Sequence, residues 1–127
     1  PLLKSDLFTI MKATTEGTLD RTEVSFSDES ACCVIVASNG YPKKFESGFR
    51  LEVPGDTERD FSFVAGAKKD QNGVTISAGG RVVGVTSVRE TLSEAIDAAY
   101  KRAADVRLEN GYYRRDIGKK ALEAYKK

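Results

Sequence analysis

The sequence has no histidine and no tryptophan, and it has only two cysteines, one methionine and three prolines. Without an imidazole, histidine-based zinc sites and catalytic triads that depend on a histidine base are largely excluded. Cys32 and Cys33 are adjacent inside an apolar run, a poor arrangement for a disulfide and one that matches no metal-binding spacing. We therefore expect both cysteines to be reduced residues of the core, which suits a cytosolic protein.

Long apolar runs and an excess of charge of one sign are also missing. No segment approaches the roughly 20 apolar residues that span a bilayer, and no signal peptide is visible. Lys and Arg together number 20, against 19 Asp and Glu, for a net charge of +1. This balance gives no bulk electrostatic reason to expect nucleic acid or membrane as a partner. The sequence predicts a cytoplasmic protein with neither partner.

The length of 127 residues suits one domain, which can bury roughly two-thirds of its unfolded surface. The first residue is Pro1 rather than methionine, and a helical pattern follows at once, so we expect a segment of a longer protein. Apolar residues at helical spacing predict a helix over residues 2–16 that ends at Gly17. Weak alternation over residues 22–26 predicts a short strand.

The middle of the chain predicts strands and turns. A continuous β-branched run over residues 31–37 predicts a strand covered on both faces. Turn-forming residues follow at 38–42, where they are well placed to line a pocket, although a plain turn is the simpler interpretation. Residues 43–60 predict a surface loop with one short strand, and Asn72-Gly73 is the strongest hairpin signal. Further strands are expected at 61–67, 74–76 and 81–88.

The C-terminal part predicts a helix, a short strand and a second helix. Thr91 and Glu94 form a capping box ahead of a helix with one apolar face. Gly111 interrupts this pattern, a strand is expected at 112–113, and Asp116 is expected to cap a final helix that runs to about Lys126. The predicted fold class is α+β, with a mostly antiparallel sheet or partial barrel and flanking helices in a single domain.

The first candidate site is Gly79-Gly80-Arg81, just ahead of an apolar strand. Glycines let a ligand approach the backbone closely, and the arginine supplies a charge-assisted fork that matches a phosphate. The alternative is a glycine bulge in a hairpin with an exposed arginine, which the tripeptide by itself favours. Gly84 in the same strand supports the binding interpretation, because three glycines weaken a segment that stability alone would fill.

The second candidate site is Arg114-Arg115-Asp116. Either arginine reaches a phosphate, while the aspartate caps the next helix and leaves its amides presented to the anion. Equally compatible is an ordinary helix start with solvated arginines, one of them paired with Asp116. Base stacking by residues 112–115 is a weaker interpretation, because acidic residues are interspersed with the basic ones. The two sites together predict an anionic small molecule held between a hairpin and a helix end, without identifiable catalytic groups.

Three ordered motifs resemble one known family. They are Cys33-Val34-Ile35-Val36-Ala37-Ser38-Asn39-Gly40-Tyr41-Pro42, Gly79-Gly80-Arg81-Val82-Val83-Gly84-Val85-Thr86 and Tyr113-Arg114-Arg115-Asp116-Ile117-Gly118. Their combination resembles the C-terminal domain of phosphoribosylamine–glycine ligase, or glycinamide ribonucleotide synthetase, an ATP-grasp enzyme. Residues 2–7 resemble the helix that follows the family's ATP-grasp core. The resemblance divides the chain into a helix leading out of that core, at 1–17, and a sheet-and-helix domain at 22–127.

The family joins the carboxylate of glycine to the amine of 5-phosphoribosylamine in de novo purine synthesis, through an acyl phosphate and with cleavage of ATP. The resemblance implies that upstream parts hold ATP and Mg²⁺, so this chain needs no cofactor of its own and is not catalytic alone. Its implied partners are the preceding ATP-grasp and N-terminal domains and the substrates glycine and 5-phosphoribosylamine. Its implied role is to form the phosphoribosyl side of the active site through Gly79, Gly80, Arg81, Arg114, Arg115 and Asp116.

The chain departs from the family pattern at the hairpin. Where the family usually has His-Ala-Gly-Thr, this sequence has Val64-Ala65-Gly66-Ala67. If the missing histidine and threonine contact the substrate, this chain binds it differently; if they only support the hairpin, binding is unchanged. Lys119 also stands where the family often has histidine or an aromatic residue. The alternative function is a stand-alone, non-catalytic module that binds a protein or an anionic metabolite.

Overall fold

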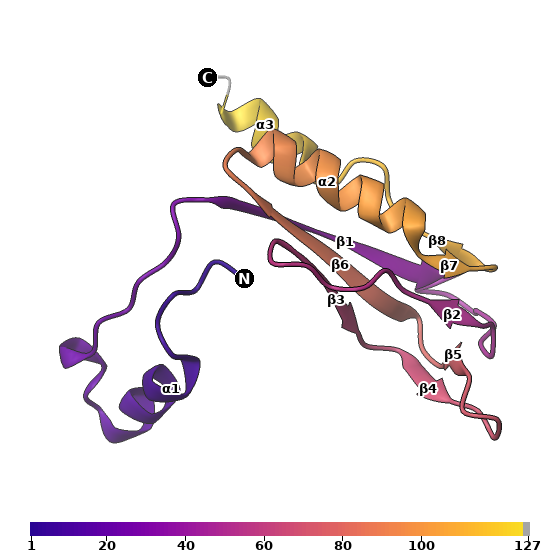
Figure 1. Ribbon diagram of the computed structural model, residues 1–127, viewed down its shortest axis with the longest axis horizontal. Helices are drawn as coiled ribbons and strands as arrows, with labels where there is room; N and C mark the ends of the chain where they lie inside the picture. The colour runs from indigo at the N-terminus through magenta and orange to yellow at the C-terminus, as the bar shows by residue number, and fades with distance from the viewer. Residues whose placement is uncertain (126–127) are drawn as a thin grey trace.

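The computed structural model of the protein describes residues 1–125. Its fold is α+β, as predicted, and its strands form an open antiparallel arrangement rather than a closed barrel (Figure 1). The elements in chain order are α1 (Leu7–Glu16), the 3-10 helix η1 (Leu19–Arg21), β1 (Ser30–Ser38), β2 (Leu51–Glu52), β3 (Asp60–Val64), β4 (Ala67–Lys69), β5 (Thr75–Ser77), β6 (Arg81–Arg89), α2 (Leu92–Asp105), β7 (Arg107–Leu108), β8 (Gly111–Tyr112) and α3 (Lys119–Tyr125).

The main sheet has the strand order β3-β6-β1-β8, and all of its pairings are antiparallel. Strands β1 and β6 are its longest members, because both are rich in β-branched residues that pack well on a pleated surface. Helix α2 lies along one face of these two strands (Figure 1). Val34 and Val85, which are paired across the sheet and fully buried, pack with Ala95 and Ala99 of the helix. The core therefore lies between α2 and this face.

The opposite face of the main sheet carries exposed apolar side chains. Ile35 is 41% exposed and Phe63 is 53% exposed, and both are paired with Gly84 of β6. Cys33 is also exposed, whereas Cys32 is buried, and both are free thiols. The prediction of a strand covered on both faces was therefore wrong, and so was the assignment of Cys33 to the core. The strand itself was predicted correctly, but α2 covers only the face of the sheet on which Cys32 lies.

Two short strand pairs extend this architecture at the end of the main sheet where β6 begins. Strand β2 pairs with β7 and β4 pairs with β5. A bridge between Arg50 and Ile76, together with backbone hydrogen bonds between residues 48–49 and Ser77, links the segment before β2 to β5. The β4–β5 hairpin turns at Asn72-Gly73, as predicted, with Gly73 at a φ of 77°, which favours glycine. The short strand expected within 43–60 is β2.

The predicted caps and boundaries of the helices are confirmed in part. Thr91 and Glu94 form the expected capping box at the start of α2. Gly17 ends α1 in the left-handed conformation, although this helix begins at Leu7 and is capped by Asp6 rather than beginning near residue 2. The final helix α3 begins at Lys119, and its expected end at Lys126 lies outside the described residues.

Helix α1 stands apart from the sheet (Figure 1). Of its ten residues only Ala13 is buried, and its apolar side chains Leu7, Phe8 and Met11 are 58%, 73% and 61% exposed. The strand predicted over 22–26 was wrong, because within that range only Phe26 makes a β-bridge, to Leu3. The N-terminal segment thus presents an apolar surface that the described residues leave uncovered.

No helix in residues 1–125 combines the length and apolar character needed to cross a membrane.

Candidate functional site

The first candidate site forms a corner where the end of β1 meets the start of β6. Ser38, the last residue of β1, is fully buried. Its hydroxyl donates a hydrogen bond of 2.9 Å to the carbonyl oxygen of Gly79. Its backbone N–H donates one of 2.8 Å to the carbonyl oxygen of Gly80. One buried serine therefore fixes two successive peptide groups of the predicted glycine segment.

The ring of Tyr41 covers Gly80. A Cβ atom added to Gly80 would lie 2.0 Å from Cδ2 of Tyr41, so only glycine fits beneath the ring. The tyrosine is held in turn by the hydroxyl of Tyr112, which donates a 2.7 Å hydrogen bond to its carbonyl oxygen, and by an edge-to-face contact with Phe45. The requirement for glycine at this position is thus a packing requirement, which the sequence pattern alone did not reveal.

A hollow of about 480 Å³ opens at this corner, on the face of the sheet away from α2. Among the described residues, Arg81 has neither an ion-pair nor a hydrogen-bond partner for its guanidinium, which makes it an available cation. A glycine backbone, a free guanidinium and an apolar floor suit an anionic group attached to a less polar body. The lining consists of Ile35, Tyr41, Ala65, Gly66, Gly80 and Arg81.

The two positions that depart from the family pattern flank this hollow. Val64 ends β3 and is 51% exposed, and Ala67 begins β4 and packs partly against the core. Ala65 and Gly66, which lie between them, line the hollow itself. Gly66 also lies close to Gly79: a Cβ added to Gly66 would lie 3.0 Å from the Cα of Gly79. Side chains at 64 and 67 thus border the site, although neither of them lines it.

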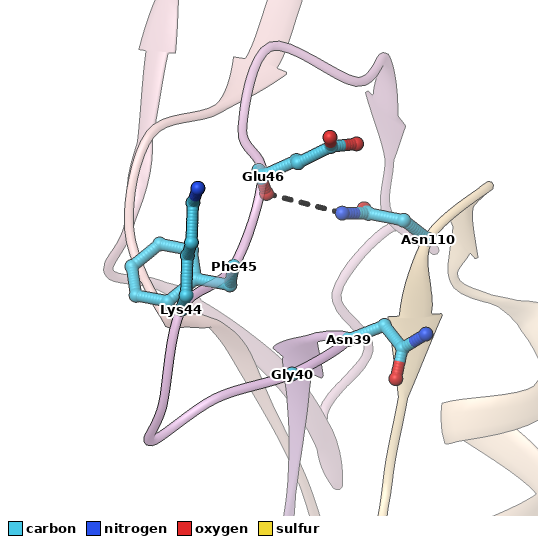
Figure 2. Close-up of a pocket in the computed structure, with 6 residues that line it drawn as sticks. All are labelled: Asn39, Gly40, Lys44, Phe45, Glu46 and Asn110. Carbon is cyan, nitrogen blue, oxygen red and sulfur yellow. Dashed lines mark hydrogen bonds between the residues drawn. The ribbon is translucent and has the colours of Figure 1, made fainter.

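A second hollow, of about 390 Å³, shares the loop at 39–46 with the first. Figure 2 shows the amide of Asn110 directed toward the backbone of Glu46, to whose carbonyl oxygen it donates a 3.1 Å hydrogen bond. The other atom of that amide, Oδ1, is buried without a hydrogen-bond donor among residues 1–125. Residues of the turn at 38–42 therefore contribute to the lining of both hollows. The second hollow is lined by Asn39, Gly40, Lys44, Phe45, Glu46 and Asn110.

The second candidate site, residues 114–116, has its side chains engaged with one another. Arg114 binds Asp116 through two contacts, of 2.6 and 2.9 Å. The hydrogen bond from Arg114 lowers the pKa of the Asp116 carboxyl and raises the pKa of the Arg114 guanidinium. Arg115 lies over the ring of Tyr113, with 4.6 Å from its guanidinium carbon to the ring centroid. Asp116 does not cap α3 as expected, because its carboxylate is bound to Arg114 and the helix begins three residues later.

The two candidate sites have different neighbours in the structure. The hydroxyl of Tyr100, on α2, donates to the carbonyl oxygen of Arg114 and accepts from the N–H of Ile117, which ties this segment to the helix. Arg81 instead lines the hollow with Ile35, on the face that α2 leaves open. A role for residues 114–116 in binding the same anion therefore remains a prediction.

The fold and the corner define a class of protein: a small α+β domain that presents a glycine–arginine corner on the open side of its sheet. Residues 31–120 match the family described as phosphoribosylglycinamide synthetase, C domain. The chain belongs to this family. The match begins with β1, so the segment that carries α1 lies outside it.

Similar proteins of known name agree with this assignment. The chain is 35% identical to the phosphoribosylamine–glycine ligase of Fusobacterium nucleatum over 121 residues, covering 93% of this chain and 28% of that protein. It is 41% identical to the enzyme of the same name from Agrobacterium fabrum over 122 residues, covering 94% and 28%. The crystal structure of the Thermotoga maritima phosphoribosylamine–glycine ligase superposes with a TM-score of 0.70 at 33% identity, covering 85% of this chain and 27% of that one. The chain thus spans little more than a quarter of the length of these relatives.

Proposed function

We propose that this chain is the C-terminal part of a phosphoribosylamine–glycine ligase and that it forms the phosphoribosyl side of the active site. The observation that carries the proposal is the guanidinium of Arg81, which has no partner within residues 1–125, beside the glycine backbone of the corner. A phosphate on the substrate would accept hydrogen bonds from this arginine, and its ribose would lie toward the apolar floor at Ile35. The family membership and the names of the relatives support this assignment.

The hollow forms only one wall of a site. It is open, and it lies at the end of the sheet face on which Ile35 and Phe63 are exposed. An apolar face beside a ligand hollow is typical of a surface that another part of an enzyme covers. We propose that the remaining parts of the ligase cover this face and supply the glycine and ATP sites, and that residues 1–17 connect to the ATP-grasp part.

ATP and Mg²⁺ are proposed to bind in those other parts. The described residues 1–125 contain no group of three or more His, Cys, Asp or Glu side chains arranged to hold a metal ion. Mg²⁺ is normally held by carboxylates together with substrate phosphates. We therefore assign this chain no step that involves the nucleotide or the metal.

The test is the substitution Arg81→Ala in the ligase that carries this chain. Losing one hydrogen bond to a charged group costs about 1.5–3 kcal/mol, so the KM for phosphoribosylamine should rise roughly tenfold or more. The KM for ATP should stay unchanged. Arg107→Ala is the matched control, because Arg107 is an exposed arginine on β7, away from the hollow. An unchanged KM for phosphoribosylamine and unchanged turnover in Arg81→Ala would contradict the proposal.

A further inference from the structure

The hydrogen bonds of Ser38 orient the glycine peptides as well as holding them in place. The carbonyl oxygen of Gly79 accepts from the Ser38 hydroxyl. In a planar trans peptide the N–H points opposite to the preceding C=O. The N–H of Gly80 must therefore point away from Ser38 and away from β1.

The N–H groups of Gly79 and Gly80 have no hydrogen-bond acceptor within residues 1–125, although both residues are half-buried. The neighbouring Ala78 N–H, by contrast, donates a 2.8 Å hydrogen bond to the carbonyl oxygen of Gly66. Both N–H groups can therefore donate to a molecule outside the described residues. Two successive unpaired donors next to an unpaired arginine indicate a place for an external acceptor.

We propose that the backbone N–H of Gly80 binds a phosphate oxygen of the substrate together with the guanidinium of Arg81, and that Ser38 is the positioning residue that holds this peptide in its donating orientation. This inference rests on the proposed function and adds to it the atoms that recognise the phosphate. A phosphate offers several oxygens, so one can accept from the amide while another meets the arginine fork.

Tyr41 explains how the amide stays available. Its ring occupies the side of Gly80 on which a Cβ would lie and contributes to the lining of the hollow. The hydrogen bond from Tyr112 holds the backbone of this tyrosine in place. Ser38 thus holds the carbonyl oxygens of Gly79 and Gly80, the ring of Tyr41 covers one side of Gly80, and the N–H of Gly80 is left available to a ligand.

The first experiment is a titration of the ¹⁵N-labelled chain with ribose 5-phosphate, followed by two-dimensional NMR, with ribose as the phosphate-free control. We expect the Gly80 amide proton to move downfield and to saturate at the same ligand concentration as the Arg81 Nε–H signal. Ribose should produce neither change. If ribose 5-phosphate shifts the Arg81 signal while the Gly80 amide stays in place, the inference is overturned and the proposed function stands.

The second experiment tests the positioning role of Ser38. Ser38→Ala should keep a dispersed spectrum, weaken ribose 5-phosphate binding three- to tenfold and remove the downfield shift of Gly80. Ser38→Thr keeps the hydroxyl and should restore the shift. Ser87→Ala is the matched control, because Ser87 is an equally buried serine at the far end of β6. If Ser38→Ala does not fold, the wild-type titration decides by itself.

The failures can be told apart. No ribose 5-phosphate-dependent shift in the wild-type chain, or wild-type affinity in a folded Ser38→Ala variant, would overturn this inference. The proposed function fails separately, on an unchanged KM for phosphoribosylamine in the Arg81→Ala ligase.

Discussion

Two segments of this molecule have similar residues and opposite chemistry. Arg81 follows two glycines whose carbonyl oxygens are bound by Ser38, and its guanidinium is unpaired among the described residues. Arg114 lies two residues from Asp116 and binds it through two contacts. The comparison teaches that an arginine motif indicates an anion site only when its neighbours leave the cation unpaired. A local carboxylate gives the arginine a partner before any ligand arrives.

The largest expected effect separates the two arginines directly. Arg81→Ala should lower the affinity of the chain for ribose 5-phosphate roughly tenfold or more, because a hydrogen bond to a charged group is worth about 1.5–3 kcal/mol. Arg114→Ala should change this affinity less than about twofold, since Arg114 is already paired. Isothermal titration calorimetry of both variants measures the difference. Equal losses of affinity in the two variants would contradict this difference between the arginines. They would support the prediction that both segments bind the same anion.

The next effect concerns the packing that the corner requires. Gly80→Ala places a Cβ 2.0 Å from Cδ2 of Tyr41, and such overpacking costs about 1–3 kcal/mol of unfolding free energy. Urea denaturation measures the loss. Gly55→Ala is the control, because nothing lies within 4 Å of a Cβ there. The double variant Tyr41→Ala/Gly80→Ala should be less destabilised than the sum of the single changes; strict additivity would show that the ring is not the cause.

The smallest effect sharpens the description of the second segment. The hydrogen bond from Arg114 holds the pKa of Asp116 below the ordinary aspartate value of about 3.9. Because the pKa of Asp116 is lower in the folded state than in the unfolded state, the ion pair stabilises the fold at pH values above the unfolded-state pKa. This stabilisation is lost as the pH falls through the folded-state pKa. Arg114→Ala should raise the pKa of Asp116 towards the ordinary value in an NMR titration of its carboxyl carbon. An unchanged titration curve would show that the pair does not persist in solution.

Much of the fold could be predicted from local signals. The capping box at Thr91 and Glu94 and the turn at Asn72-Gly73 each depend on residues within four positions of one another, and both were found as predicted. The exposure of Cys33 could not be predicted in this way, because an apolar run does not reveal whether both faces of its strand are covered. That outcome depends on the number of helices that pack on the sheet.

The candidate site was predictable only in its residue types. The glycines and Arg81 were identified from the sequence, but the role of Ser38 was not, because that serine meets Gly79 across 41 residues of chain. Asp116 was misassigned as a helix cap for a related reason. A carboxylate near a helix start can bond either to the helix amides or to a nearby arginine, and here Arg114 lies close enough to bind it.

The strand order also determines when, during synthesis, the ring of Tyr41 over Gly80 can gain its support. Strand β1 lies in the interior of the main sheet, but its neighbour β8 belongs to the last part of the chain. The Tyr112 hydroxyl reaches the carbonyl oxygen of Tyr41 over a separation of 71 residues. Such distant pairings are slow to form, because the loop between them must close first. A ribosome must therefore release nearly the whole of this chain before the ring over Gly80 gains its support, so a chain cut short before β8 would lack that support.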